Sequence, residues 1–469
     1  RYVNEETIIG YDLLNEPVLA PGYTNVALRS LYVRIISAIR TLDKNHMVFI
    51  EGNWYATDFS SLTPPMDTNL VYSFHKYWSE TTKSTIQQYI NIRNEFNVPL
   101  WLGESGENSN PWFYETIKLM EENEIGWNWW THKKISTTTS PYSSPISDNY
   151  QRVLDYLGGY GDRPSEEFSQ KALFEMAENL ALEKCIYLPD VVAAIFSQDF
   201  NFQSQPYKPH PIPGMIAAVD YDKGNQSVAY YDTDYKRTRW DAWEPWNTGG
   251  AYRNDGVDIG EIAAEKGGGF YVGWIENGEW LQYTIDVAVD GVYDLVFAVA
   301  SAGDAGKIRA KMDGVASGTD LSVPNTSDWQ NWTQIRLPGI ALTKGTHHFR
   351  IEFIGGGFNL SQIAFNLRSA ENLDEIGKEG FMGQNFPNPF NNKTSIPVVL
   401  NSRTNVRAEV YNTRGQLVRT LFDADHDAGL LTLSWDGENN TGLPVTSGSY
   451  FYMLRIGESK KSKKMLYLK

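Results

Sequence analysis

Two glutamates stand directly behind short apolar runs of the sequence, and both could take part in acid–base chemistry. Glu16 lies near the end of segment 8–17 (IIGYDLLNEP), and Glu104 closes segment 100–104 (LWLGE). Apolar runs of this length, separated by single amphipathic helices, are typical of buried parallel β-strands. We therefore expect both carboxylates at the C-terminal ends of parallel strands, where barrel enzymes place their reactive groups. A carboxylate taken alone at such a point is more often an ordinary solvated loop residue.

The pair gains weight from polar and aromatic companions at matching strand ends, namely Asn15, His75, Tyr77 and Trp130. Two carboxylates that face one pocket are what glycosidic bond cleavage requires, because one protonates the leaving oxygen while the other attacks the anomeric carbon. His75 by itself would be interpreted as a core histidine bound to a backbone carbonyl. The set as a whole predicts a site for sugar chemistry.

The elements that must position these side chains lie within residues 1–165. Apolar runs occupy 8–14, 46–50, 70–74, 99–103 and 125–129, and apolar residues at helical spacing predict a helix over 25–42. This alternation predicts a parallel α/β sheet or barrel. Five parallel strands do not close a barrel of eight. We therefore expect a partial (β/α)8 TIM barrel, with three upstream strand–helix units missing from a chain that begins at Arg1.

Four segments together resemble strands four, six, seven and eight of a glycoside hydrolase family 5 catalytic domain of the cellulase type: 8–17 (IIGYDLLNEP), 74–77 (FHKY), 100–104 (LWLGE) and 126–130 (GWNWW). The resemblance covers residues 1–165, as the C-terminal part of such a barrel running from strand four to strand eight. It implies a retaining mechanism in which Glu16 is the general acid/base and Glu104 the nucleophile.

The same resemblance implies a role for each companion residue. Asn15 would bind the 2-hydroxyl of the reacting sugar, His75 and Tyr77 would contact that sugar, and Trp130 would be the platform beneath it. The family also uses an Arg of the second strand and a His of the third, and neither segment is present here. We therefore expect the chain as it stands to be inactive or misfolded in this region, and the parent protein to be active.

A second region, residues 210–368, has short alternating strands between glycine-rich turns, which is typical of a β-sandwich. Blocks 213–216, 229–232, 252–259, 272–280, 329–333 and 357–360, in this order, resemble a family 6 carbohydrate-binding module with a jelly-roll fold. The resemblance implies that Trp274 and Trp329 sandwich a sugar ring and that Asn359 fixes its hydroxyls. Edge packing is the alternative for the two tryptophans. Trp280 and Trp332 alternate to the opposite face and are predicted to be core residues.

Calcium is where this module departs from its relatives, whose structural site uses two glutamates of a Glu-Ala-Glu-Asp stretch. This chain has the segment 217–220 (AAVD) there, and methyl groups are no ligands for Ca²⁺. We expect the usual calcium site to be absent, so that a structural calcium ion would need other ligands, and we expect no metal or cofactor in catalysis. A second cluster around Asp255 and Asp258 could hold a metal, but we interpret the two as exposed acids of a turn.

A third region, residues 383–469, resembles the C-terminal sorting domain of the bacterial type IX secretion system, a small immunoglobulin-like sandwich. Its motifs are 385–391 (NFPNPFN), 411–415 (YNTRG), 435–437 (WDG) and 448–452 (GSYFY), followed by a lysine-rich end. The resemblance implies that this machinery is a partner and that the protein is extracellular or at the cell surface of a bacterium. Hairpin turns would explain each short motif alone, and a solvated tail would explain the lysines.

Composition limits the remaining classes of partner. The 469 residues hold 41 Lys and Arg against 57 Asp and Glu, so the net charge is −16, which disfavours nucleic acid and anionic membranes. The single cysteine, Cys185, excludes an intramolecular disulfide and a multi-thiolate metal site. No apolar run reaches the length of a transmembrane helix. Residues 166–209 are predicted to be a helical extension with a proline-rich linker, residues 369–382 a second linker, and the protein a monomer.

These observations indicate a secreted, retaining endo-β-glycanase that hydrolyses β-1,4-glucan, a cellulose-like polysaccharide, by double displacement while its binding module tethers it to the substrate. Specificity for mannan, xyloglucan or β-1,3-glucan stays open. A second hypothesis is a non-catalytic surface glycan-binding protein with a dead barrel. A third is a sandwich that mediates protein contacts and binds no sugar.

Overall fold

The computed structural model describes residues 2–468 except 242–244, 304–305, 371–379, 384, 386–387, 392, 401 and 428. Most of the predicted linker 369–382 and part of the motif 385–391 therefore lie outside the described residues. The chain divides into two compact units. The first comprises Arg1–Ser204, Gly224–Val228 and Asp232–Ile259, and the second comprises Gln205–Lys223, Ala229–Tyr231 and Gly260–Lys469.

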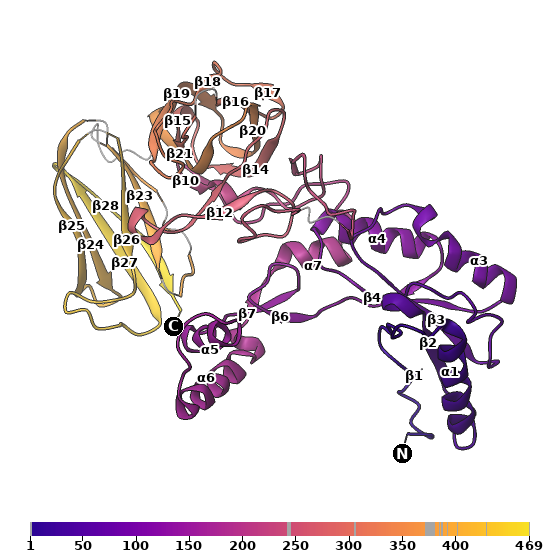
Figure 1. Cartoon of the computed structure of the whole chain (residues 1–469). Helices are drawn as coiled ribbons and strands as arrows, with labels where there is room; N and C mark the ends of the chain where they lie inside the picture. Colours follow the sequence, from indigo (N-terminus) through magenta and orange to yellow (C-terminus); the bar gives the residue numbers. More distant parts are fainter. Residues whose placement is uncertain are drawn as a thin grey trace. The chain divides into compact units, whose positions relative to one another are not determined.

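The first unit holds a five-stranded sheet in which spatial order equals chain order and every pair of neighbours is parallel (Figure 1). Its strands are β1 (Gly10–Asp12), β2 (Met47–Glu51), β3 (Leu70–Lys76), β4 (Leu100–Ser105) and β5 (Gly126–Trp127). The helices of this part are α1 (Asn25–Arg40), α2 (Asn53–Ala56), η1 (Lys83–Ile86), α3 (Gln87–Phe96) and α4 (Asn110–Glu122). The predicted parallel arrangement is confirmed, while its placement as strands four to eight of a barrel stays a prediction.

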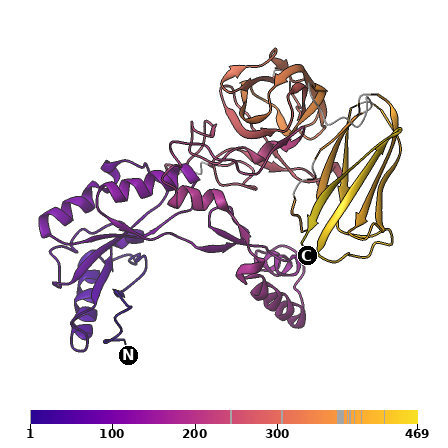
Figure 2. The ribbon, with the colours of Figure 1, turned by 180° about the vertical axis from the view of Figure 1, so that it is seen from behind.

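One hydrophobic cluster joins the sheet to the helices α1, α3 and α4. Figure 2 shows the ribbon of this unit from behind. Helix α1 contributes Leu28, Tyr32 and Ile36, which recur every four residues on one helix face. Leu31 lies off this face and is 40% exposed. All seven residues of β3 are buried, as expected for a central parallel strand covered on both faces.

The chain then leaves the sheet through a helical extension. A small sheet of β6 (Lys133–Ile135), β7 (Tyr142–Ser144) and β8 (Ile186–Tyr187) accompanies α5 (Asp148–Leu157), α6 (Glu166–Asn179), η2 (Leu182–Lys184) and α7 (Pro189–Phe196). The hydroxyls of Ser147 and Ser165 cap the N-termini of α5 and α6. Helix α7 packs on α4 through a second cluster that includes Trp112, Phe113 and Val191, which fixes α4 from both sides.

A β-sandwich follows, made of a six-stranded and a seven-stranded sheet. The first has the order β12-β13-β21-β15-β19 with β10 on β21; the second has the order β11-β14-β20-β16-β17 with β18 on β16 and β9 on β14. The elements are β9 (Pro211–Ile212), β10 (Gly214–Ala217), η3 (Ala218–Asp220), β11 (Tyr230–Tyr231), β12 (Ile259–Glu261), η4 (Ala264–Lys266), β13 (Phe270–Val272), β14 (Trp280–Val287), β15 (Gly291–Ala300), β16 (Lys307–Met312), β17 (Val315–Ala316), β18 (Leu321–Ser322), β19 (Thr333–Leu342), β20 (Gly345–Gly355) and β21 (Asn359–Ala370).

The C-terminal domain is also β-rich, with a three-stranded sheet of β22 (Gly380–Met382), β23 (Thr394–Leu400) and β26 (Gly429–Trp435) and a four-stranded sheet of β24 (Thr404–Asn412), β25 (Leu417–His426), β27 (Gly448–Ile456) and β28 (Ser459–Tyr467). One hydrophobic cluster fills its interior. Four of the terminal lysines, Lys460, Lys461, Lys463 and Lys464, lie in β28, so the reading of these four as a loose solvated tail is wrong. Within the described part of the chain, no helix has the length and apolar character needed to cross a bilayer.

Candidate active site

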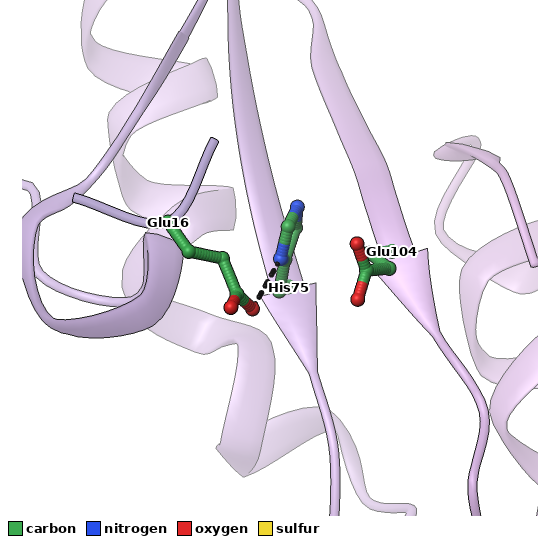
Figure 3. A group of neighbouring side chains, drawn as sticks. All are labelled: Glu16, His75 and Glu104. Carbon is green, nitrogen blue, oxygen red and sulfur yellow. Dashed lines mark hydrogen bonds and ion pairs between the residues drawn. The ribbon is translucent and has the colours of Figure 1, made fainter. Parts of the chain in front are cut away.

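Three side chains converge at the C-terminal ends of the parallel strands in the first unit. Figure 3 shows Glu16 from the loop after β1, His75 from β3 and Glu104 from β4 facing a common space. One carboxylate oxygen of each glutamate and one ring nitrogen of His75 all lie within 4.8 Å of one another. His75 and Glu104 follow Glu16 by 59 and 88 positions in the sequence. The three side chains meet because β1, β3 and β4 end at the same edge of one parallel sheet.

His75 is the centre of this group. Its side chain is 4% exposed, its Nδ1 lies 2.8 Å from Glu16 Oε1, and its Nε2 lies 3.3 Å from Glu51 Oε1. Burial by itself lowers the pKa of His75, but the contacts with Glu51 and Glu16 and the negative charge of Glu104 outweigh burial and raise that pKa above its ordinary value. These contacts therefore stabilise the charged form of the imidazole.

Tyr77 holds the second glutamate. Its hydroxyl donates a hydrogen bond to Glu104 Oε1 at 2.6 Å. Burial, then this hydrogen bond and the charge of Glu104, raise the pKa of Tyr77 far above its ordinary value. The phenol consequently keeps its proton and remains a donor to Glu104 at any ordinary pH.

The two remaining predicted residues lie beside the group without joining it through side-chain hydrogen bonds. Asn15 precedes Glu16 and is exposed. Trp130 is 47% exposed, and its backbone N–H donates to the carbonyl oxygen of Ser105 at 2.7 Å, so the Trp130 backbone lies beside the residue that follows Glu104. A half-exposed indole offers a face on which a sugar ring could stack.

Glu51 and Asp12 belong to this group, although the sequence reasoning gave neither a role. Glu51 ends β2 and is 2% exposed, and its Oε2 accepts a hydrogen bond from the backbone N–H of Glu16 at 2.5 Å. Desolvation, then the charge of Glu51 and a hydrogen bond with it, raise the pKa of Asp12 to about 7, although Asp12 as a whole residue stays exposed. The available signal was that Glu51 directly follows the apolar run 46–50, whereas Asp12 lies inside the run 8–14.

The spacing of Glu16, His75 and Glu104 would also admit a metal ion, and they are the one such group among the residues described. However, Glu16 Oε1 already faces a ring nitrogen of His75, and Glu104 Oε1 accepts from Tyr77. These hydrogen bonds explain why the carboxylate oxygens and the ring nitrogen lie so close together. We therefore interpret the group as an acid–base site and assign no metal to it.

Of the predicted residues of the sandwich, Trp274 and Trp329 lie outside the strands, and Asn359 is the first residue of β21. Trp274 and Trp329 are 50% and 49% exposed, and Tyr271 stacks on Trp274 with ring centroids 6.2 Å apart. Asn359 is buried, and its Nδ2 donates to the carbonyl of Trp329 at 2.7 Å. The amide of Asn359 therefore holds the loop that carries Trp329, which leaves Oδ1 as its remaining polar atom for a ligand.

Two interpretations of the sandwich region need correction. Trp280 and Trp332 are only partly buried rather than core residues, and the guanidinium of Arg350 covers the Trp280 ring at 3.7 Å. Asp255 is not an exposed turn residue: it is 1% exposed, pairs with Arg253 at 2.5 Å and accepts from Asn110 Nδ2 at 2.6 Å. Arg253 is a near neighbour in the sequence, but Asn110 lies 145 residues away, and no local pattern could indicate that contact.

Three stretches of the chain match known families. Residues 1–136 match the cellulase family (glycosyl hydrolase family 5), residues 251–367 match the carbohydrate binding module family 6, and residues 391–455 match the FlgD Ig-like domain. The first two matches support a cellulase-type family 5 domain at residues 1–136 and a family 6 carbohydrate-binding module at residues 251–367. Its third domain is similar to an immunoglobulin-like domain, in agreement with its β-rich fold.

Individual proteins are similar to parts of the chain. Endoglucanase C of Acetivibrio thermocellus is 24% identical over 217 residues, which are 33% of this chain and 62% of the relative; the chain thus spans less than two thirds of that protein. The C-terminal family 6 module of a marine laminarinase from Zobellia galactanivorans is 37% identical, covering 23% of this chain and 87% of that one with a TM-score of 0.21. A family 6 module of Cellvibrio mixtus lichenase 5A, solved with cellotriose, is 29% identical, covering 25% and 88% with a TM-score of 0.22.

Proposed function

We propose that the protein is a retaining endo-β-glycanase that cleaves β-1,4-glucan by double displacement. The observation that carries this proposal is the distance within 4.8 Å between a carboxylate oxygen of Glu16 and one of Glu104. Retaining glycosidases keep their two carboxyl groups about 5–5.5 Å apart, whereas inverting enzymes need about 6.5–9.5 Å to admit a water molecule. The family 5 match and the endoglucanase relative support the same reading.

In the first step, Glu104 attacks the anomeric carbon while Glu16 gives its proton to the departing glycosidic oxygen, which leaves a glycosyl ester on Glu104. Tyr77 fixes Glu104 Oε1 by its hydrogen bond, so the other oxygen is the one directed at the sugar. In the second step, Glu16 takes a proton from water, and the resulting hydroxide hydrolyses the ester. The exposed face of Trp130 supports the sugar ring.

Replacement of each glutamate tests the assignment. With soluble β-1,4-glucan, Glu104→Gln is expected to lower kcat on the order of 10⁴-fold or more, and Glu16→Gln about 10²–10⁴-fold. Glu122→Gln, on the exposed face of α4, is the matched control and should leave turnover unchanged. The configuration of the first product, followed by NMR, is expected to be that of the substrate. Inversion, or equal turnover in all three variants, would refute the mechanism.

Substrate specificity is settled by the same assay on a panel. β-1,4-glucan is our first choice, and mannan, xyloglucan and β-1,3-glucan are the competing substrates. Faster reducing-end release from one of these three would move the assignment to that polysaccharide. A release of long oligosaccharides at early times is expected for endo action.

A second candidate is a glycan-binding protein without catalysis, and the half-exposed Trp274 and Trp329 favour it because they do not depend on the glutamates. It predicts glycan binding with no turnover and no effect of Glu104→Gln.

We further propose a monomer that is exported by the type IX machinery, on the basis of the motifs within 383–469 and the Ig-like match. Export that continues after deletion of those residues would contradict this role.

A further inference from the structure

Glu51 is a buried acid that the double-displacement scheme does not use. It is the last residue of β2, between β1 and β3 in the sheet, and it is 2% exposed. Its backbone carbonyl accepts a hydrogen bond from the Tyr32 hydroxyl at 2.9 Å, which ties the strand end to α1. A carboxylate buried to this degree is costly unless its oxygens are bound by charged or donor groups.

Both oxygens of Glu51 have such partners, and both partners belong to the candidate site. Oε2 accepts from the backbone N–H of Glu16 at 2.5 Å, and Oε1 lies 3.3 Å from His75 Nε2. Glu16 has a φ of +46°, a left-handed conformation that is unfavourable for a residue with a side chain. The contact with Glu51 thus helps to hold Glu16 in a backbone state it would not keep alone.

His75 lies between two carboxylates. Nδ1 is 2.8 Å from Glu16 Oε1 and Nε2 is 3.3 Å from Glu51 Oε1, and a histidine donates from both nitrogens only when it is protonated. The negative charge of Glu104 also stabilises the protonated ring, and the pKa of His75 is raised by these contacts together. Asp12 is a further titratable group beside Glu51.

We propose that Glu51 is a positioning residue that keeps His75 as an imidazolium bridge between Glu51 and Glu16. This inference rests on the proposed function and extends it. Because His75 donates to Glu16 Oε1, the acidic proton of Glu16 resides on Oε2 and is the one given to the leaving oxygen. The carboxylate formed in that step keeps the hydrogen bond from His75, and water restores the Glu16 proton in the second step. His75 holds both of its ring protons throughout.

An NMR titration of the histidine ring nitrogens in the whole protein tests this arrangement. In the wild type, His75 should carry a proton on both nitrogens at neutral pH and titrate above its ordinary pKa of about 6.5. Glu51→Gln keeps the shape but replaces a charged acceptor by an amide that can donate to Nε2. It should therefore lower the His75 midpoint by about one pH unit or more and leave a neutral ring protonated at Nδ1.

Two controls accompany that titration. His46 faces Asp43 rather than Glu51, so its signal reports whether Glu51→Gln folds correctly. Glu107→Gln removes another carboxylate whose ion pair is with Lys134, and it should leave the His75 midpoint in place. A wild-type midpoint at or below 6.5, or a midpoint unchanged by Glu51→Gln while His46 is also unchanged, would overturn the proposal. If the His46 signal moves, Glu51→Gln has not folded correctly, and the wild-type midpoint of His75 alone tests the proposal.

Kinetics separate this inference from the proposed function. Glu51→Gln should lower kcat about 10²-fold with little change in KM, because the general acid is misplaced while the sugar contacts remain, and the alkaline limb of the pH profile should move to lower pH. If Glu104→Gln abolishes turnover but Glu51→Gln alters neither the pH profile nor the His75 titration, the function stands and the inference fails. If His75 titrates as expected but no glycan is cleaved, the function fails and the bridge stands.

Discussion

Single hydrogen bonds decide which oxygen of each candidate catalytic carboxylate is free to react. One oxygen of Glu16 faces His75, and one oxygen of Glu104 accepts from Tyr77. Each glutamate therefore has one oxygen fixed by the protein and one left for the substrate. A hydrogen bond to one oxygen keeps the carboxylate in a defined rotamer. The reaction requires this because its rate depends on how the reacting oxygen is oriented toward the substrate.

A second acid–histidine pair of the same unit should govern its stability rather than its chemistry. His46 Nδ1 lies 2.6 Å from Asp43 Oδ2, and the Tyr11 hydroxyl donates to the same oxygen at 2.7 Å. The contact with the Glu5 carbonyl, then that with Asp43, raises the pKa of His46. Burial acts to raise the pKa of Asp43, but hydrogen bonds from His46, Tyr11 and Asn45 outweigh it and lower that pKa.

The pH dependence follows from these two directions. The stabilisation from His46 is complete below its ordinary pKa of about 6.5 and is lost as the pH rises through its raised folded value. The stabilisation from Asp43 is complete above about pH 4 and is lost as the pH falls through its lowered folded value. We therefore expect the Tm difference between the wild type and Asp43→Asn to be largest at about pH 5–6 and to shrink on both sides. A difference that is constant from pH 3 to 9 would contradict this account.

At the scale of elements, local patterns predicted the strands, and only their pairing revealed the partners of the site. The run 70–74 predicted β3, and the positions of His75 and Glu104 behind their runs predicted their meeting at one sheet edge. The part played by Glu51 depends on β2 lying between β1 and β3, and the burial of Asp255 depends on Asn110, which is 145 residues away. Periodicity describes one segment at a time and cannot supply such contacts.

The loop after β4 requires a glycine at position 106. Its φ is +151°, and a Cβ atom added there would lie 2.0 Å from the carbonyl oxygen of Trp130. Gly106→Ala should therefore push the Trp130 segment away from Glu104 and lower the free energy of unfolding by about 1–3 kcal/mol. Urea unfolding measures the change.

Gly158→Ala is the matched control, because its φ is negative and a Cβ atom there meets only ordinary contacts from 3.4 Å. The two variants should differ clearly in midpoint, and Gly106→Ala should also lose activity because it displaces the backbone that carries Trp130, the proposed platform for the sugar. Equal midpoints would show that the loop accommodates a side chain, and the geometry of the Trp130 platform would then have another origin.

At the scale of the whole molecule, the proposed catalytic domain and a domain similar to family 6 binding modules share one chain. Linkage converts binding by the second domain into a higher local concentration of substrate at the first. The benefit does not require a fixed arrangement of the domains, only a common polysaccharide long enough for both. It should therefore appear with long or insoluble glycans and vanish with short ones.

Trp274 and Trp329 give the test of that linkage, since each exposes about half of its surface at 50% and 49%. Trp329→Ala in the whole protein should abolish retardation in gels that contain the polysaccharide and lower activity on insoluble glucan about 10-fold or more, while kcat on a short soluble oligosaccharide stays the same. Trp240→Ala removes a different exposed indole, 71% accessible, and should change none of these. If Trp329→Ala lowers turnover of short and long substrates equally, its effect reaches the catalytic domain itself and the tethering role is wrong. If it changes neither binding nor turnover, the half-exposed tryptophans are packing residues of a sandwich that serves another purpose, and sugar chemistry rests on Glu16 and Glu104 alone.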